Sequence, residues 1–113
     1  MPAVLLETNA EISDPNLLGQ ELSKAVAKGL SKPEKYVTVS IRSSQTMIRA
    51  GNPSIFAFIE IRSIGGFSLP VNNTLSTTIC EILSTYGLLK SNIDVNFMDI
   101  SPENWGKHHG TFG

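Results

Sequence analysis

Apolar and polar residues along the chain follow two different periods, and the change between the periods predicts strands and helices in alternation. Ala3 to Glu7 is almost wholly apolar, which is typical of a strand buried on both faces. A helix is expected next, because Asp14 before Pro15 forms an N-cap with proline at the first helical position. Apolar residues then recur with the helical period at Leu18, Leu22, Ala25, Val26 and Gly29.

Tyr36 to Ser43 alternates strictly and predicts a second strand. The second half of the chain repeats the series, because Phe56 to Arg62 indicates a strand that only Glu60 interrupts. A second helix is marked by Leu75, Ile79, Ile82, Leu83 and Tyr86, with Gly87 as its expected left-handed stop, and Ile93, Val95 and Phe97 alternate in a last strand.

Corresponding elements of the two halves lie about 57 positions apart, as Tyr36 and Ile93 do. We therefore expect one α/β domain over residues 1–113, built from pseudo-repeats of about 1–50 and 51–113. Right-handed βαβ crossovers give a four-stranded mixed sheet with two helices on one face. The other face would then expose strands that are apolar on both sides, and such surfaces favour association. An oligomer is expected.

Composition narrows the function classes. The 113 residues include 9 Lys and Arg against 10 Asp and Glu, so no basic excess exists for a nucleic-acid partner. Apolar runs such as Ile55 to Ile59 are far shorter than the ~20 residues that cross a bilayer, so no membrane partner is expected. The first residues lack the basic region of a signal peptide, and the expected location is cytoplasmic.

Most candidate chemistry has a simpler structural explanation. His108 and His109 are the only histidines, and adjacent residues do not converge on one ion without other ligands, so we expect no metal. Cys80, the only cysteine, lies in the second helical pattern and is expected to be a small buried hydrophobe. The Gly65-Gly66 pair lacks a nucleotide-binding fingerprint and predicts a turn. No cofactor is expected.

Pro2 is the exception, because removal of Met1 would leave it with a free secondary amine. An α-amino group has an ordinary pKa of about 7.7–8.0, and apolar surroundings lower it further by disfavouring the charged form. The strand Ala3 to Glu7 would hold this amine at its end. Pro2 is therefore a candidate base, although Met-Pro is also a common start of a chain.

Five features occur together in a particular order. They are Met1-Pro2, the Lys32-Pro33 turn followed by Tyr36, the turn Ser63 to Gly66, the strand Asp94 to Phe97, and the C-terminal Gly110 to Phe112. In this order and spacing the chain resembles, over its whole length, the macrophage migration inhibitory factor (MIF) family of the tautomerase superfamily.

The resemblance implies a homotrimer in which three sheets line a barrel and the helices cover its outside. It implies a keto-enol tautomerase that acts on a small aromatic 2-keto acid of the phenylpyruvate or dopachrome type. Pro2 would be the catalytic base and acid, and Lys32 with the backbone amide of Ile64 would bind the substrate's acidic and enolic oxygens. The remaining substrate-binding residues implied are Tyr36, Ser63, Trp105 and, from a neighbouring subunit, Asn96 and Asp94.

Asp94 departs from the family, whose vertebrate members have a tyrosine at this position in the pocket. A carboxylate here could repel an anionic substrate or simply face water. Two alternatives to the enzyme also stay open: a MIF-like binding or signalling protein with vestigial tautomerase activity, and a monomeric or dimeric ferredoxin-like module in which Pro2 has no role.

Overall fold

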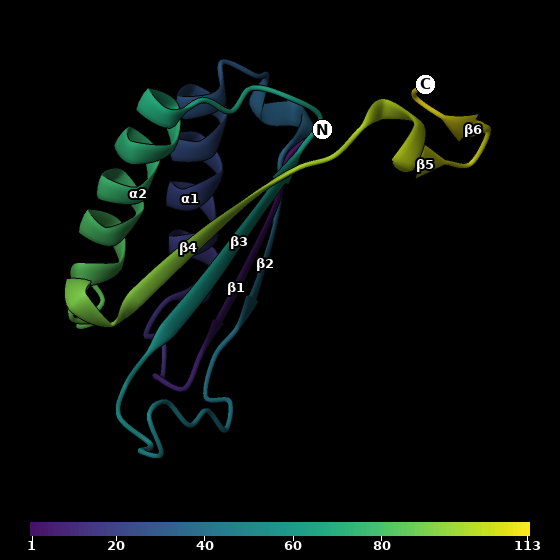
Figure 1. The fold of residues 1–113 in the computed structure, drawn as a ribbon. Helices are drawn as coiled ribbons and strands as arrows, with labels where there is room; N and C mark the ends of the chain where they lie inside the picture. The colour runs from purple at the N-terminus through teal and green to yellow at the C-terminus, as the bar shows by residue number, and fades with distance from the viewer.

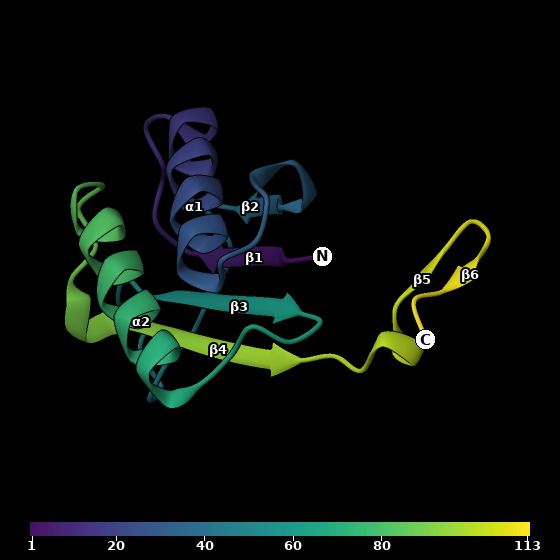
Figure 2. The same cartoon turned by 90° about the horizontal axis from the view of Figure 1, so that it is seen from above.

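The computed structural model describes residues 1–113 and contains a four-stranded sheet with two helices on one face (Figures 1 and 2). The strand order is β2-β1-β3-β4, with β1 parallel to β2, β3 parallel to β4, and the central pair β1 and β3 antiparallel. The predicted mixed sheet is confirmed. The elements are β1 (Ala3–Thr8), α1 (Pro15–Leu30), β2 (Thr38–Arg42), β3 (Ala57–Ser63), α2 (Leu69–Ser84) and β4 (Ile93–Asp99).

Both helices begin at a capped proline turn. The Asp14 side chain accepts a hydrogen bond from Leu17 N at 3.1 Å, and Ser68 Oγ accepts one from Val71 N at 3.3 Å. The two N-caps are 54 positions apart (68 − 14), and not about 57, because the equivalent of Asp14 is Ser68. The strands that precede them, β1 and β3, begin at Ala3 and Ala57 and have the same spacing.

Two predicted boundaries shift. Tyr36 does not start a strand but ends the short 3₁₀ helix η1 (Glu34–Tyr36), because Val37 N donates to Glu34 O at 2.9 Å and delays β2 until Thr38. Gly87 has a left-handed φ of 91°, as a stop residue would, but α2 already ends at Ser84. Gly87 instead turns the chain toward β4.

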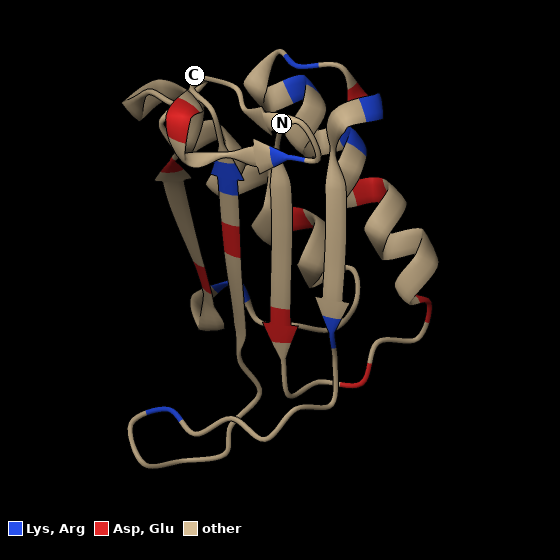
Figure 3. Ribbon diagram, turned by 90° about the vertical axis from the view of Figure 1, so that its right-hand side faces the viewer, with Lys and Arg blue, Asp and Glu red and all other residues tan.

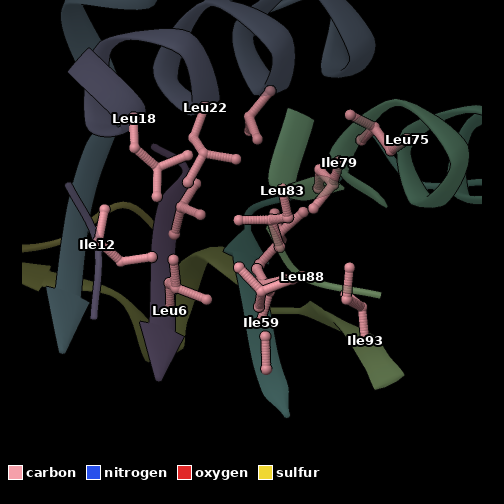
Figure 4. Packing of buried hydrophobic residues seen from close by; sticks show 14 of the residues in the cluster. Leu6, Ile12, Leu18, Leu22, Ile59, Leu75, Ile79, Leu83, Leu88 and Ile93 are labelled. Carbon is pink, nitrogen blue, oxygen red and sulfur yellow. The ribbon is translucent and has the colours of Figure 1, made fainter. Parts of the chain in front are cut away.

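The core lies between the sheet and the helices, and Figure 4 shows Leu18 and Leu22 of α1 beside Leu6 of β1. The two helices also approach one another closely. A Cβ added at Gly29 would lie 2.5 Å from Leu75 Cδ2, so only glycine fits there. Cys80 packs against this core but is only partly buried, which corrects the expectation of a buried thiol.

The open face, by which we mean the sheet surface opposite the helices, differs from the apolar surface expected from the sequence. In β1, Val4, Leu6 and Thr8 are buried under the helices, whereas Glu7 is exposed on the open face. In β3 the open face carries Phe58, Glu60 and Arg62, and Figure 3 shows acidic and basic residues along its strands. The sequence predicted that β1 would be buried on both faces. Instead, β1 and β3 each have an apolar face under the helices and a face of mixed polarity on the open side.

Residues 101–113 form an arm that extends away from the two layers (Figures 1 and 2). The arm contains η3 (Pro102–Asn104) and a small hairpin of β5 (Gly106–Lys107) and β6 (Gly110–Thr111). Phe112 is 44% exposed on it. Neither long helix of the chain has the length and apolar character needed to cross a membrane.

Candidate active site at the amino end of β1

Pro2 is fully buried where the chain enters β1. Its carbonyl oxygen accepts a hydrogen bond from Thr38 N at 3.1 Å, which ties the residue to the start of β2. The β1 and β3 ladder ends at the pair Ala3 and Arg62, so the same register continued by one step places Pro2 opposite Ser63. Pro2 is thus tied to β2 by a hydrogen bond and lies beside the end of β3 by register.

Lys32 reaches the same end of the sheet through the C-terminus of α1. Ser31 adopts a left-handed conformation with φ 55°, and Lys32 N donates to Ala27 O at 2.9 Å, so the helix closes and the chain turns sharply. The Lys32 side chain then spans to the loop after β3, where its Nζ donates to Ile64 O at 2.8 Å. The ammonium is therefore oriented before any ligand binds.

The turn from Ser63 to Gly66 is held in place by its own contacts. Gly65 and Gly66 have φ values of 70° and 92°, and Gly65 N donates to Asp99 Oδ1 at 2.9 Å. A Cβ at Gly66 would lie 3.2 Å from Lys32 Cε, so the missing side chain leaves room for the lysine. Ile64 N–H donates to no loop or side-chain group.

The charge near the N-terminus is positive. The amine of Met1 has a pKa below its ordinary value of 8.0, first because of burial and then because of Lys32 and Lys107. Both effects disfavour a charged amine. The same two lysines would attract an anionic ligand, so this end of the sheet combines a weakened amine with cationic and N–H donors.

Two more of the predicted site residues lie at this end. Tyr36 follows the Lys32-Pro33 turn and is 44% exposed. Trp105, on the arm, lines a cavity of about 320 Å³ together with Ala3 and Arg62. Lys32 and Ile64 are in direct contact at this end of the sheet, whereas Trp105 lies on its other face, beside the exposed Arg62.

Asp94 and Asn96 do not join them within one chain. Asp94 pairs with Phe58 near the start of β3, five residues before Ser63, which is about 17 Å along a strand. Asn96 pairs with Glu60, between the two ends. Asp94 and Asn96 could approach a Pro2 only if that Pro2 belonged to another copy of the chain.

Two residues near the candidate site residues, Arg49 and Asp99, were not predicted from the sequence. The Arg49 guanidinium lies 4.1 Å from the centre of the Phe56 ring and 3.9 Å from Asp94 Oδ2, so Asp94 has a cationic neighbour. The long loop between β2 and β3 supplies Arg49, and loop residues carry no periodic signal. The contact of Asp99 with the turn after β3 follows from the parallel register, which places the end of β4 beside Ser63. The sequence alone does not give that register.

Metal-type ligands do not gather here, since no three His, Cys, Asp or Glu side chains lie close enough to hold an ion. His108 and His109 contact one another on the exposed arm, with ring centres 4.6 Å apart. The functional groups at the amino end of β1 are therefore an amine, an ammonium, an N–H and aromatic side chains.

Comparison with known proteins agrees with this fold. The model of the family described as macrophage migration inhibitory factor (MIF) matches residues 1–113. A macrophage migration inhibitory factor of Xenopus tropicalis is 31% identical over 99% of both chains. A D-dopachrome decarboxylase of Gallus gallus is 36% identical over 96% of this chain and 94% of its own.

A solved structure gives the same result in three dimensions. The MIF homologue of Prochlorococcus marinus superposes with a TM-score of 0.91 at 30% identity, covering 98% of this chain and 99% of its own. The chain belongs to the macrophage migration inhibitory factor family and has its tautomerase-type fold.

Proposed function

We propose that this protein is a keto-enol tautomerase for small aromatic 2-keto acids of the phenylpyruvate or dopachrome type, with Pro2 as its general base and acid. The observation that carries the proposal is the burial of Pro2 at an end of the sheet where Lys32 is fixed to Ile64 O at 2.8 Å. At the same end, burial and then the charges of Lys32 and Lys107 lower the pKa of the Met1 amine. The similarity to a D-dopachrome decarboxylase supports the same class of substrate.

The reaction moves one proton. The Pro2 nitrogen takes a proton from C3 of the keto acid, the carbon next to the ketone, and the resulting enolate is stabilised by the Lys32 ammonium and the Ile64 N–H. The protonated amine then gives the proton to the enolate oxygen, and the reverse sequence forms the ketone. A base of near-neutral pKa is needed in both directions, which is why a weakened amine suits the task.

Met1 must be absent for this chemistry. With Met1 attached, the Pro2 nitrogen is a tertiary amide that has no proton to give and no basic lone pair. The positions of Lys32 and Lys107 near the N-terminus mean that the new amine would meet the same positive charges.

We further propose a homotrimer, because the site of one chain is incomplete. Asp94 and Asn96 lie on the open face, away from their own Pro2, and the arm of residues 101–113 extends away from the body of its own subunit. A neighbouring copy would bring Asn96 to the far end of the substrate. Light scattering after size exclusion should give roughly three times 12.2 kDa, and a monomer at micromolar concentration would contradict the shared site.

The enzymatic proposal is tested by enol-to-keto conversion of phenylpyruvate with wild-type protein whose N-terminus is shown by mass to be Pro2. Pro2→Gly keeps an α-amine but makes it primary and frees its backbone, so we expect a loss of about 100-fold or more in kcat/KM with the oligomer intact. Wild-type rates in folded Pro2→Gly would show that the secondary amine of proline is not required, whereas absence of turnover by the processed wild-type protein would favour the binding-protein alternative.

A further inference from the structure

The hydroxyl of Ser63 is buried and has no hydrogen-bond partner. Ser63 has no exposed surface, and its Oγ is one of two buried side-chain oxygens in the chain without a partner. A buried hydroxyl without a partner loses its hydrogen bonds to water and gains none in return, so native proteins rarely leave one unpaired. The family resemblance implies that this serine binds the substrate, whereas its side chain is buried on the helix side of β3.

Pro2 is the neighbour that could pair with this hydroxyl. The β1 and β3 register places Pro2 opposite Ser63, and both residues are fully buried. In the chain with Met1 attached, the Pro2 nitrogen is an amide nitrogen that neither donates nor accepts a hydrogen bond. Once Met1 is removed, the same nitrogen becomes an amine, and a partner for the hydroxyl is created.

We propose that Ser63 is a positioning residue whose hydroxyl hydrogen-bonds the free amine of Pro2 and sets its orientation and basicity. This inference rests on the proposed function for its catalytic meaning, but the bond itself can be detected without turnover. Ser63 touches no substrate in this role and acts only through Pro2.

The direction of the effect follows from the strength of the two possible bonds. The hydroxyl can donate to the neutral amine or accept from the protonated one, and the charge-assisted bond is roughly twice as strong. Ser63 therefore favours the protonated amine and raises its pKa, opposing the effect of burial and of Lys32 and Lys107. The other charged groups nearby are occupied elsewhere: Asp99 accepts from Gly65 N, and Arg62 pairs with Glu60 on the open face.

The test is a titration of the Pro2 amine by NMR in processed protein labelled with ¹⁵N-proline. Ser63→Ala should lower the amine's pKa by about 0.5–1 pH unit, and Ser63→Thr, which keeps the hydroxyl, should restore most of it. Ser40→Ala removes a hydroxyl from the exposed side of β2 and should leave the titration unchanged. If Ser63→Ala does not fold, Ser63→Cys replaces the hydroxyl with a weaker donor and acceptor and should shift the pKa in the same direction.

A second measurement separates this inference from the proposed activity. Ser63→Ala should lower the melting temperature of processed protein but not that of protein retaining Met1, since the hydroxyl has a partner only in the first. An unchanged amine pKa in folded, processed Ser63→Ala, or an equal loss of melting temperature in both forms, overturns the inference even if tautomerase activity is present. A shifted pKa without turnover would support the bond and reject the enzyme.

Discussion

The two ends of β3 differ in how firmly their side chains are held. At the Pro2 end, formed by Pro2, Lys32 and the Ser63–Gly66 turn, the proline is buried and the lysine and turn are fixed by hydrogen bonds of 2.8 and 2.9 Å. At the Asp94 end, formed by Asp94, Arg49 and Phe56, the ion pair measures 3.9 Å and its side chains are 53% and 48% exposed.

This difference suggests a division of roles. The proposed proton transfer needs groups that are oriented before the substrate arrives, and the groups at the Pro2 end are fixed in this way. Substrate choice can vary through exposed side chains that tolerate replacement, and the Asp94 end is of that kind. Changes at the Pro2 end should therefore cost much of the activity, whereas changes at the Asp94 end should alter it by smaller factors.

Among the residues around Pro2, the largest effect is expected for Lys32→Gln, which removes the ammonium but keeps a side chain of similar reach. Hydrogen bonds to charged groups contribute about 1.5–3 kcal/mol, so kcat/KM for phenylpyruvate should fall about 10- to 100-fold. Lys24→Gln, an exposed lysine on the same helix, is the matched control and should keep full activity. Equal rates for both variants would show that Lys32 only ties the turn together.

Gly66→Ala should have an intermediate effect. Alanine at φ 92° costs about 1 kcal/mol, and its Cβ would press on Lys32 Cε at 3.2 Å. Gly65→Ala is the control, because Gly65 also has a positive φ of 70° but nothing lies within 4 Å of an added Cβ. Thermal denaturation should show similar losses of stability for both variants, while only Gly66→Ala should raise KM. A KM raised equally in both would mean that backbone strain, and not the lysine, is responsible.

Asp94→Tyr tests the other end of the sheet. The replacement removes a carboxylate and adds aromatic contact area worth about 0.5–1.5 kcal/mol, so kcat/KM for an aromatic keto acid should rise by a few-fold to about tenfold. Asp94→Asn removes the charge alone and separates the two contributions. If neither variant changes kcat/KM, Asp94 does not face the substrate pocket. Of the two residues expected from a neighbouring subunit, only Asn96 would then contact the substrate.

The smallest effect is expected for Cys80→Ser, on α2 and away from both ends. Cys80 is the only cysteine, and burial raises the pKa of its thiol, so it stays protonated and unreactive. Activity should be the same as in the wild type, with or without a reducing agent. A loss of turnover in folded Cys80→Ser would place a functional thiol in the protein and contradict this account.

The sequence predicted the architecture well because period and capping are local. Asp14-Pro15 and the alternation after Tyr36 sufficed to predict α1 and β2 within a few residues. The prediction of an apolar open face was wrong. Apolar residues such as Leu5 and Phe58 share that surface with charged ones, namely Glu7, Glu60 and Arg62. Only the register of neighbouring strands shows which of these side chains lie together.

The candidate site was predictable in part. Lys32, Ser63 and Ile64 lie at the Pro2 end as the family resemblance implied. The burial of Ser63, the support of Gly65 by Asp99 and the placing of Arg49 beside Asp94 depend on contacts between segments far apart in the chain. A pattern in one segment carries no information about such contacts.

The central claim, that the amine of Pro2 is the base, is tested most directly by comparing two forms of the same chain. One form is processed to Pro2, the other retains Met1 completely, and intact mass establishes each. Phenylpyruvate turnover should be present in the processed form and at least about 100-fold slower in the form with Met1, whose Pro2 nitrogen is an amide. Equal turnover by the two forms would contradict the claim.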